Sequence, residues 1–165
     1  MLKKGIDVIL LYRVLKDQAN ENAKTVTYQT EHSFTMSRSS DSTPTKDGNV
    51  QSTGAIEYDF SSTALYERGS ETIKMLYDAF MNNETIEVWI VDKLDKDESG
   101  KFAAKYLHAD ITSYEETANS EDNVEVSLEY GVQLVHQDGY ATLSQEQEKA
   151  VQYAFEDTVK KTPEG

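Results

Sequence analysis

The sequence predicts a mainly β domain of the α+β class: an antiparallel β-sandwich or partly closed barrel with one flanking helix and a C-terminal helix. Three observations support this fold class. Apolar and polar residues alternate with a period of two in most of the chain, a helical period occurs in only two segments, and the segment order lacks a regular strand-helix-strand repeat. At 165 residues the chain is expected to form a single domain, 1–165.

The first half of the chain is predicted to form three strands. Residues 5–15 are apolar and rich in β-branched side chains, which indicates a strand covered on both faces for part of its length. After a polar connection, residues 24–34 alternate in the manner of a half-buried strand. A third strand is indicated by the alternating residues Ile56, Tyr58 and Phe60.

A helix over residues 70–82 is predicted to cover one face of the sheet. Its apolar positions recur at the spacing of a single helical face: Ile73, Leu76, Tyr77 and Phe80. Ser70 precedes this pattern as an N-cap, and two asparagines at 82–83 end it.

Strands resume after this helix, first over residues 85–93 and then as a long hairpin of 101–117 and 123–136. Along the last strand every second residue is apolar, while the alternate positions carry polar side chains that include Glu125 and Glu129. The sheet is therefore predicted to have one apolar face and one negative face in this region.

The C-terminal segment is predicted to leave the sheet. Asp138-Gly139 is typical of a turn, and Ser144 with Gln147 forms a capping-box pattern before an apolar stripe. A helix or arm over residues 144–165 is expected.

Acidic residues dominate the composition, with 30 Asp and Glu against 16 Lys and Arg and a formal net charge of −14. Residues 106–148 contain ten acidic residues and no Lys or Arg. Tight binding to phosphate backbones comes from clustered cations that release counterions, so the composition argues against a protein that binds nucleic acid tightly.

The longest apolar stretch near the N-terminus, residues 8–12, is too short for a signal peptide core or a membrane span, and a soluble protein is predicted.

No catalytic, metal or cofactor site is predicted. The chain has no cysteine, its three histidines lie on separate predicted strands, and it contains neither a G-x-S-x-G elbow nor a glycine-rich phosphate loop. Residues 95–100 match the first half of a calcium-binding loop, but Tyr106 stands where the bidentate glutamate is needed. A solvated hairpin turn is predicted there.

Residues 36–54 are predicted to form a long polar loop between two strands. The segment has almost no apolar content and holds six Ser or Thr between Ser37 and Thr45. Loops longer than about 12 to 15 residues are uncommon in compact domains and are usually functional or disordered. The loop is therefore either disordered in the isolated protein or ordered against a partner.

A series of short motifs runs from about residue 4 to about residue 160: Thr30-Glu31-His32-Ser33, Ser37-Arg38, Asp41-Ser42, Thr45-Lys46-Asp47-Gly48, Glu87-Val88-Trp89, Ile111-Thr112-Ser113, Leu128-Glu129, Asp138-Gly139 and Val151-Gln152-Tyr153, with Phe155 and Asp157-Thr158. In their order and spacing these motifs resemble the major tail protein, or tail tube protein, of bacteriophages with long non-contractile tails that infect Gram-positive hosts.

The resemblance implies a structural virion protein without enzymatic activity, made in the host bacterial cytoplasm and placed in the tail. It implies hexameric rings that stack into a hollow tube, the conduit for genome ejection. The implied partners are other copies of the chain, the tape measure protein, tail-end proteins and passing double-stranded DNA that is not bound tightly.

The resemblance also places residues 37–53 as the loop that stacks onto the neighbouring ring. The charged residues of this loop are the candidates for inter-ring ion pairs: Arg38, Asp41, Lys46 and Asp47.

Electrostatics and the resemblance together predict which face lines the tube. DNA carries about one negative charge per 1.7 Å of axis, so a wall that lets it slide should repel it, and this repulsion acts within roughly 10 Å at ordinary salt. We expect the negative face with Glu125 and Glu129 to line the lumen and the helix over 70–82 to lie outside.

The alternative is a monomeric β-sandwich module that binds a receptor or a carbohydrate through its tyrosines and Trp89.

Overall fold

The alternating segments of the sequence pair into a single antiparallel sheet. In the computed structural model, which describes residues 1–144 and 147, the strand order is β2-β1-β5-β6-β7-β4-β3, and all neighbouring strands run antiparallel. This sheet confirms the mainly β class. The elements are β1 (Val8–Val14), β2 (Lys24–Thr25), β3 (Gln29–Thr45), β4 (Gly48–Leu65), α1 (Glu71–Met81), β5 (Ile86–Lys96), β6 (Phe102–Thr117) and β7 (Glu125–Ala141), with short 3-10 turns at Gly5–Asp7 and Leu15–Asp17.

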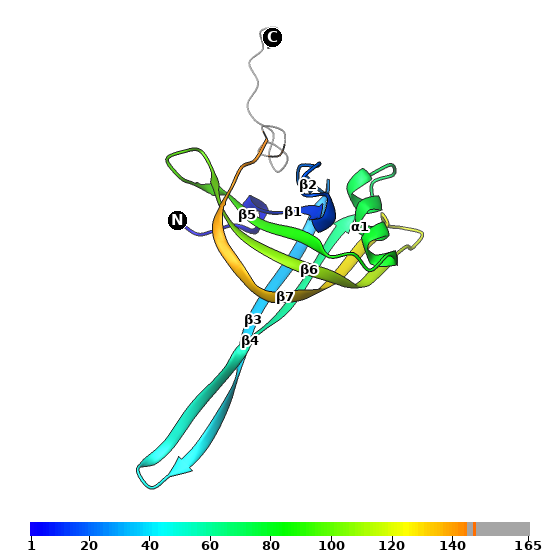
Figure 1. Cartoon of the computed structure of the whole chain (residues 1–165). Coiled ribbons are helices and arrows are strands. Elements are labelled where there is room, and N and C mark those ends of the chain that lie inside the picture. The colour runs from blue at the N-terminus through cyan, green and yellow to red at the C-terminus, as the bar shows by residue number, and fades with distance from the viewer. Residues whose placement is uncertain (145–146, 148–165) are drawn as a thin grey trace.

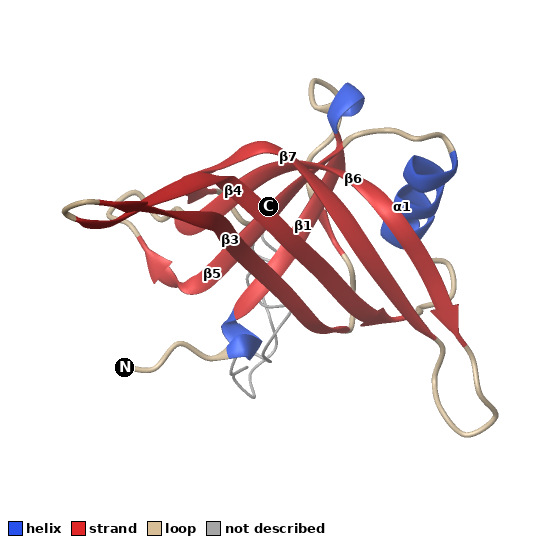
Figure 2. Cartoon of the chain, turned by 90° about the horizontal axis from the view of Figure 1, so that it is seen from below, coloured by secondary structure: helices blue, strands red, loops and turns tan. Residues whose placement is uncertain are grey.

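The sheet curls until its two ends meet, which gives the partly closed barrel seen in Figures 1 and 2. Gln29 at the start of β3 donates from Nε2 to the carbonyl of Leu10 in β1 at 2.8 Å, and its Oε1 accepts from the Leu10 N–H at 3.0 Å. A side-chain amide offers the same donor and acceptor pair as a peptide group. Gln29 therefore substitutes for one rung of a strand ladder and joins the two ends of the sheet.

The concave face of the sheet holds the main hydrophobic core, and α1 closes one end of it. Ile73, Leu76 and Ala79 of α1 are buried among apolar side chains of the strands. The Oγ of Ser70 accepts from the N–H of Ile73 at 3.3 Å, so both the predicted helix and its N-cap are confirmed. In the part of the chain that the structure describes, no helix is long and apolar enough to cross a bilayer.

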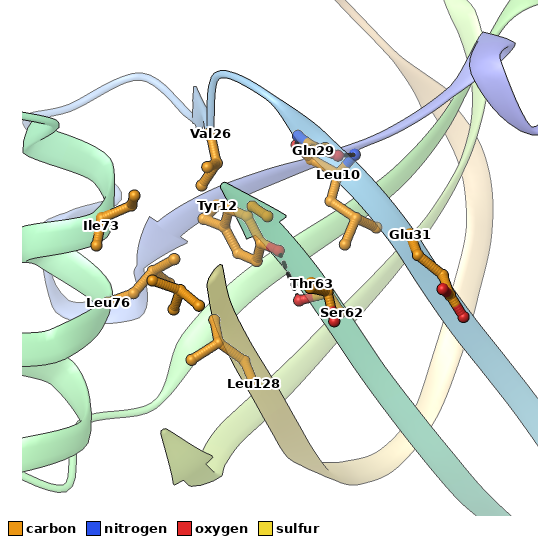
Figure 3. A pocket seen from close by; sticks show the side chains of 12 residues that line it. Leu10, Tyr12, Val26, Gln29, Glu31, Ser62, Thr63, Ile73, Leu76 and Leu128 are labelled. Carbon is orange, nitrogen blue, oxygen red and sulfur yellow. Dashed lines mark hydrogen bonds between the residues drawn. The ribbon is translucent and has the colours of Figure 1, made fainter. Parts of the chain in front are cut away.

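A hydroxyl cluster inside the core ties β1, β4 and β7 together. Figure 3 shows two of its members, Tyr12 and Ser62, whose hydroxyl oxygens lie 3.4 Å apart. The hydroxyls of Tyr12 and Tyr130 lie 3.0 Å apart, and the Tyr130 hydroxyl lies 2.7 Å from the Oγ of Ser62. Burial raises the pKa of both tyrosines. The cavity beside the cluster has a volume of about 20 Å³, which is room for roughly one water molecule. Side chains thus fill this part of the barrel.

The convex face is covered only in part. Next to β1 and β5, the chain that follows β7 places Leu143 against Ile9, Leu11, Val91 and Phe102. The predicted capping box is confirmed, because Ser144 Oγ accepts from the Gln147 N–H at 3.1 Å and Gln147 Oε1 accepts from the Ser144 N–H at 3.0 Å. The rest of the predicted helix or arm over 144–165 lies outside the described residues.

A buried ion pair on this face links β1 to β5. The carboxylate of Glu87, which is 1% exposed, accepts from Arg13 Nε at 3.0 Å and Nη2 at 2.9 Å. It also accepts from the Tyr106 hydroxyl at 2.6 Å. The hydrogen bonds to Glu87 raise the pKa of the Arg13 guanidinium. Both oxygens of the buried carboxylate therefore have a charged donor.

The prediction of a loop over residues 36–54 is wrong. β3 continues to Thr45 and β4 begins at Gly48, so the two strands form a long hairpin closed by Lys46 and Asp47. Gly48 has a φ of +121°, which a residue with a side chain rarely adopts. Ser and Thr occupy both faces of this hairpin, so no apolar period marks its strands, and the backbone ladder alone defines them.

Two smaller predictions also differ from the structure. The predicted strand over 24–34 is interrupted at Tyr28, which has a φ of +59° and separates β2 from β3. The predicted Asp138-Gly139 turn is absent, because β7 runs on to Ala141 and Gly139 pairs with Ala104 of β6. The pairing with β6 therefore outweighs the preference of Asp-Gly for a turn.

We predict that Arg13→Met lowers the free energy of unfolding by about 3 kcal/mol or more, because it leaves the buried Glu87 carboxylate without its charged partner. Urea denaturation of the dispersed subunit would measure this loss. The matched control is Lys16→Met, which removes the ion pair of Lys16 with Glu84 at the surface and is expected to change stability far less. Equal losses in the two variants would contradict the role given to the Arg13 pair.

Candidate functional site

The outer part of the β3-β4 hairpin stands away from the barrel as an arm, defined here as residues 35–59 (Figure 1). β4 pairs with β7 only over residues 60–65, and beyond this point β3 and β4 pair only with each other. Every side chain from residue 35 to 53 is exposed. An isolated two-stranded hairpin is marginally stable in water, so this arm has the features of a segment that packs against another chain.

The structure brings the four charged residues that were predicted to make ion pairs onto this arm. Lys46 and Asp47 form its tip, Asp41 lies opposite Ser52, and Arg38 lies nearer the base. Arg38 Nη1 donates to the carbonyl of Gly54 at 2.9 Å. Among residues 1–144 and 147, none of the four charged side chains makes an ion pair.

The two faces of the arm base differ in character. Strand alternation places Met36 beside Tyr58 and Arg38 beside Ile56 on the face that continues the concave side of the sheet. The opposite face carries Ser37 with Glu57 and Thr35 with Asp59. The base of the arm thus extends both the apolar and the acidic character of the sheet outward.

Tyr58 fastens the base of the arm to β7. Its hydroxyl accepts from the backbone N–H of His136 at 3.0 Å and lies 2.9 Å from His136 Nδ1. The Phe34 ring packs against both partners, with centroids 5.5 Å from Tyr58 and 5.9 Å from His136. This contact spans the fork where β4 leaves β7, so it sets the direction in which the arm projects.

A bulge in β7 makes this contact possible. Tyr106 pairs with Gln137 and His108 with Gln133, so the three residues between them on β7 oppose one residue of β6. The bulge frees the His136 N–H from the ladder, and it holds Leu134 at a φ of +53° with its side chain 91% exposed. A leucine in this conformation is strained. Sequence reasoning missed the bulge, because its residues continue the alternation of the strand.

Glu125 and Glu129 lie on an acidic face, defined here as the side of β6, β7, β4 and β3 that points away from α1. Val126, Leu128 and Tyr130 point into the core, so the two glutamates, which occupy alternate positions of β7, are exposed on the other side, as predicted. Register adds further carboxylates on this face: Glu31, Glu57, Asp59 and Glu115. The strand segments that form it, 29–37, 55–65, 110–117 and 125–131, contain no Lys or Arg.

The acidic face is bounded by two unpaired strand edges. β3 pairs with β4 on one side and, in the described chain, with no strand on the other. β6 pairs with β5 only as far as Ala109, so within residues 1–144 its residues 110–117 have β7 on one side and an open edge on the other. An open edge presents free N–H and C=O groups that can pair with another chain. The open edge of β6 could be anticipated from the sequence only because the strand predicted before it is shorter than the hairpin strand that pairs with it.

Comparison with known proteins gives a consistent result. A family model described as phage tail tube protein matches residues 3–138. A tail protein of Staphylococcus phage phiMR25 is 29% identical over 96% of this chain and 84% of that protein. The tail tube protein gp17.1* of Bacillus phage SPP1 is 29% identical over 75% of this chain, and the match spans 47% of the SPP1 protein, less than half its length.

Solved structures agree with the sequence matches. The SPP1 tail tube, determined by solid-state NMR and cryo-EM, has a TM-score of 0.78 at 25% identity, with 99% of this chain and 96% of that chain covered. The tail of a gene transfer agent particle, with C6 symmetry, has a TM-score of 0.64 at 11% identity, with 82% and 98% covered. The second likeness is one of fold.

We predict that Tyr58→Phe loosens the arm, because the phenyl ring keeps the packing against Phe34 but loses both hydrogen bonds to His136. Amide hydrogen exchange should become at least several-fold faster around residues 56–60 and 134–137, while exchange in α1 stays unchanged. Tyr140→Phe, at an exposed tyrosine of the same sheet, is the control and should have no such effect. Unchanged exchange at the arm base would show that Tyr58 does not hold it.

Proposed function

Because this chain belongs to the phage tail tube protein family, we propose that six copies of it close into a ring through their open strand edges and that these rings stack into the tail tube. The chain is a structural component of the virion tail and not an enzyme. The single observation that carries the ring proposal is the pair of open edges on opposite sides of the acidic face.

Strand direction supports this joint. β6, β7, β4 and β3 alternate in direction, so β3 runs antiparallel to β6 within the subunit. In a cyclic ring every copy has the same orientation, and β3 of one copy would meet β6 of the next as an antiparallel pair. The joint would extend the sheet without a change of pattern, in the way that an added strand completes an exposed edge.

The size of the resulting sheet suits a conduit. Six copies of four strands at about 4.8 Å spacing would enclose a closed sheet roughly 37 Å across before strand tilt is included. Barrels of 16 to 18 strands already leave an aqueous channel. A ring of this size would therefore have an open centre. Only the side chains on one face of the sheet would point into it.

We propose that the acidic face is this inner wall. α1 covers the other face of the same sheet, so α1 would lie outside the lumen. A wall with Glu125 and Glu129 and no Lys or Arg nearby repels the phosphate backbone over about a Debye length. Double-stranded DNA would pass during genome ejection without binding tightly. The tape measure protein and tail-end proteins are the further partners that the family resemblance implies.

The arm would join one ring to the next. The arm tip and the β6-β7 turn lie at opposite ends of the molecule (Figure 2), so an arm that follows the strand direction would extend past the edge of its own ring. Its exposed backbone and side chains then gain partners on the neighbouring ring. Arg38, Asp41, Lys46 and Asp47 are proposed to form ion pairs across this contact.

We predict that shortening the arm uncouples stacking from ring formation. A variant in which Arg38 is joined to Ile56 through an Asn-Gly turn should form rings but no tubes at high concentration, as seen by negative-stain microscopy. The unmodified chain should form both. Tubes from the shortened variant would exclude the stacking role of the arm, and an unmodified chain that stays small at high concentration would contradict the ring proposal and favour the monomeric binding module.

We predict that the double variant Glu125→Lys, Glu129→Lys makes the tube retain DNA. Its assembled form should bind duplex DNA at low salt, with an affinity that falls steeply as salt is raised. The control replaces two exposed carboxylates at the end of β5 and in the following turn, Asp95→Lys and Glu98→Lys. It changes the net charge equally but lies away from the acidic face. Equal retention by both variants, or by neither, would contradict the lumen assignment.

A further inference from the structure

We propose that the aromatic surface beside the open edge of β6, defined here as Tyr66, Tyr77, Met81 and Tyr114, is covered in the ring by Met36 and its neighbours on β3 of the adjacent copy. The proposal rests on the ring proposed above and names the contact that holds its joints together. Its occupant is therefore a second copy of this chain.

The surface is formed by partly exposed side chains and lies next to the open edge. Tyr66, Tyr77 and Met81 are 41%, 43% and 61% exposed. The ring of Tyr77 in α1 packs edge-on against Tyr114 of β6, with centroids 5.3 Å apart, and Phe80 stacks on the same tyrosine at 6.3 Å. Tyr114 lies within the unpaired stretch of β6. Contiguous exposed apolar side chains of this kind mark protein contacts.

The acidic face cannot hold the joint together. Where β3 of one copy meets β6 of the next, that face brings Glu31 and Glu115 toward the same joint, and carboxylates facing one another across a sheet repel. Beyond the backbone hydrogen bonds, the attraction between side chains must then come from the other face of the joint. On β6 this other face carries Tyr114, which packs against Tyr77 of α1. Met81 lies one helical turn after Tyr77, on the same side of α1.

β3 offers a matching apolar face. Side chains that alternate along a strand share a face, so His32, Phe34 and Met36 lie on the side of β3 that faces the core. Phe34 is half-buried in its own subunit, whereas Met36 is 45% exposed. Pairing of β3 with the open edge of β6 would bring these side chains to the same side of the sheet as Tyr114. Methionine adapts its shape and packs well against aromatic rings.

Tyr114 is held for this contact by a carboxylate of its own strand. Its hydroxyl donates to Glu116 Oε1 at 2.8 Å, and burial together with that hydrogen bond raises the pKa of the phenol. The polar end of the ring therefore points along β6, and its faces are left for Tyr77, Phe80 and a neighbouring chain.

The absence of native cysteine allows a direct test by cross-linking. A chain carrying Met36→Cys and Met81→Cys, assembled and treated with a short bismaleimide, should give a ladder of covalent multimers that ends at the size of the ring. The matched control, Met36→Cys with Leu94→Cys, uses an exposed leucine near the far end of β5 and should give no ladder. Rings visible by microscopy without a ladder would overturn this contact but leave the ring intact, whereas failure of the unmodified chain to form rings would overturn both.

A second pair of variants tests the energetic role of the surface. Tyr77→Gln should raise the subunit concentration needed for half-maximal ring formation about tenfold, while Asp78→Gln at the next position of α1 should change it less than twofold. Circular dichroism of the dispersed subunits would confirm that α1 is intact in both. An unchanged assembly concentration for Tyr77→Gln, with the helix intact, would contradict the proposal.

Discussion

Backbone groups that lack partners within the subunit determine how this protein is built. Among the described residues, β3 pairs with no strand on its outer side, where the Gln29 side chain alone reaches β1, and β6 pairs with no strand on one side over residues 110–117. Open edges of this length are an aggregation hazard in a protein that stays alone. A cyclic assembly pairs both edges at once. Association through these edges therefore stops when the ring is closed. The exposed arm and the acidic face acquire their roles only when the edges are paired.

The position of α1 gives the two faces of the sheet their different characters. Ile73, Leu76 and Ala79 of α1 are part of the core on the concave side, and Val126, Leu128 and Phe60 of β7 and β4 point into the same core. The alternate residues point the other way, where they are free to be acidic. Gln29 and the Tyr12-Ser62-Tyr130 hydroxyl cluster fix the curl that keeps these faces apart. A single alternation of residues thus provides both a packed core and a negative wall.

Much of the fold follows from local patterns in the sequence. The helix, the β6-β7 hairpin and the exposure of Glu125 and Glu129 were all predictable, because each follows from a local period of apolar residues, to which Ser70 adds a cap in the helix. The outer part of the arm, residues 39–53, was not, since its strands are polar on both faces and have no apolar period. The contact of Tyr58 with His136 and the bridge from Gln29 to Leu10 join residues far apart in the chain. Only the assembled sheet brings such pairs together.

The central claim is that one continuous sheet, closed through β3 and β6 of adjacent copies, forms the inner wall of the tube. A helical cryo-EM reconstruction of tubes assembled from this chain tests it most directly. The account predicts backbone hydrogen bonds between β3 of one copy and residues 110–117 of the next, with Glu125 and Glu129 directed toward the axis and α1 outside. Unpaired β3 and β6 edges, or these two carboxylates on the outer wall, would contradict it.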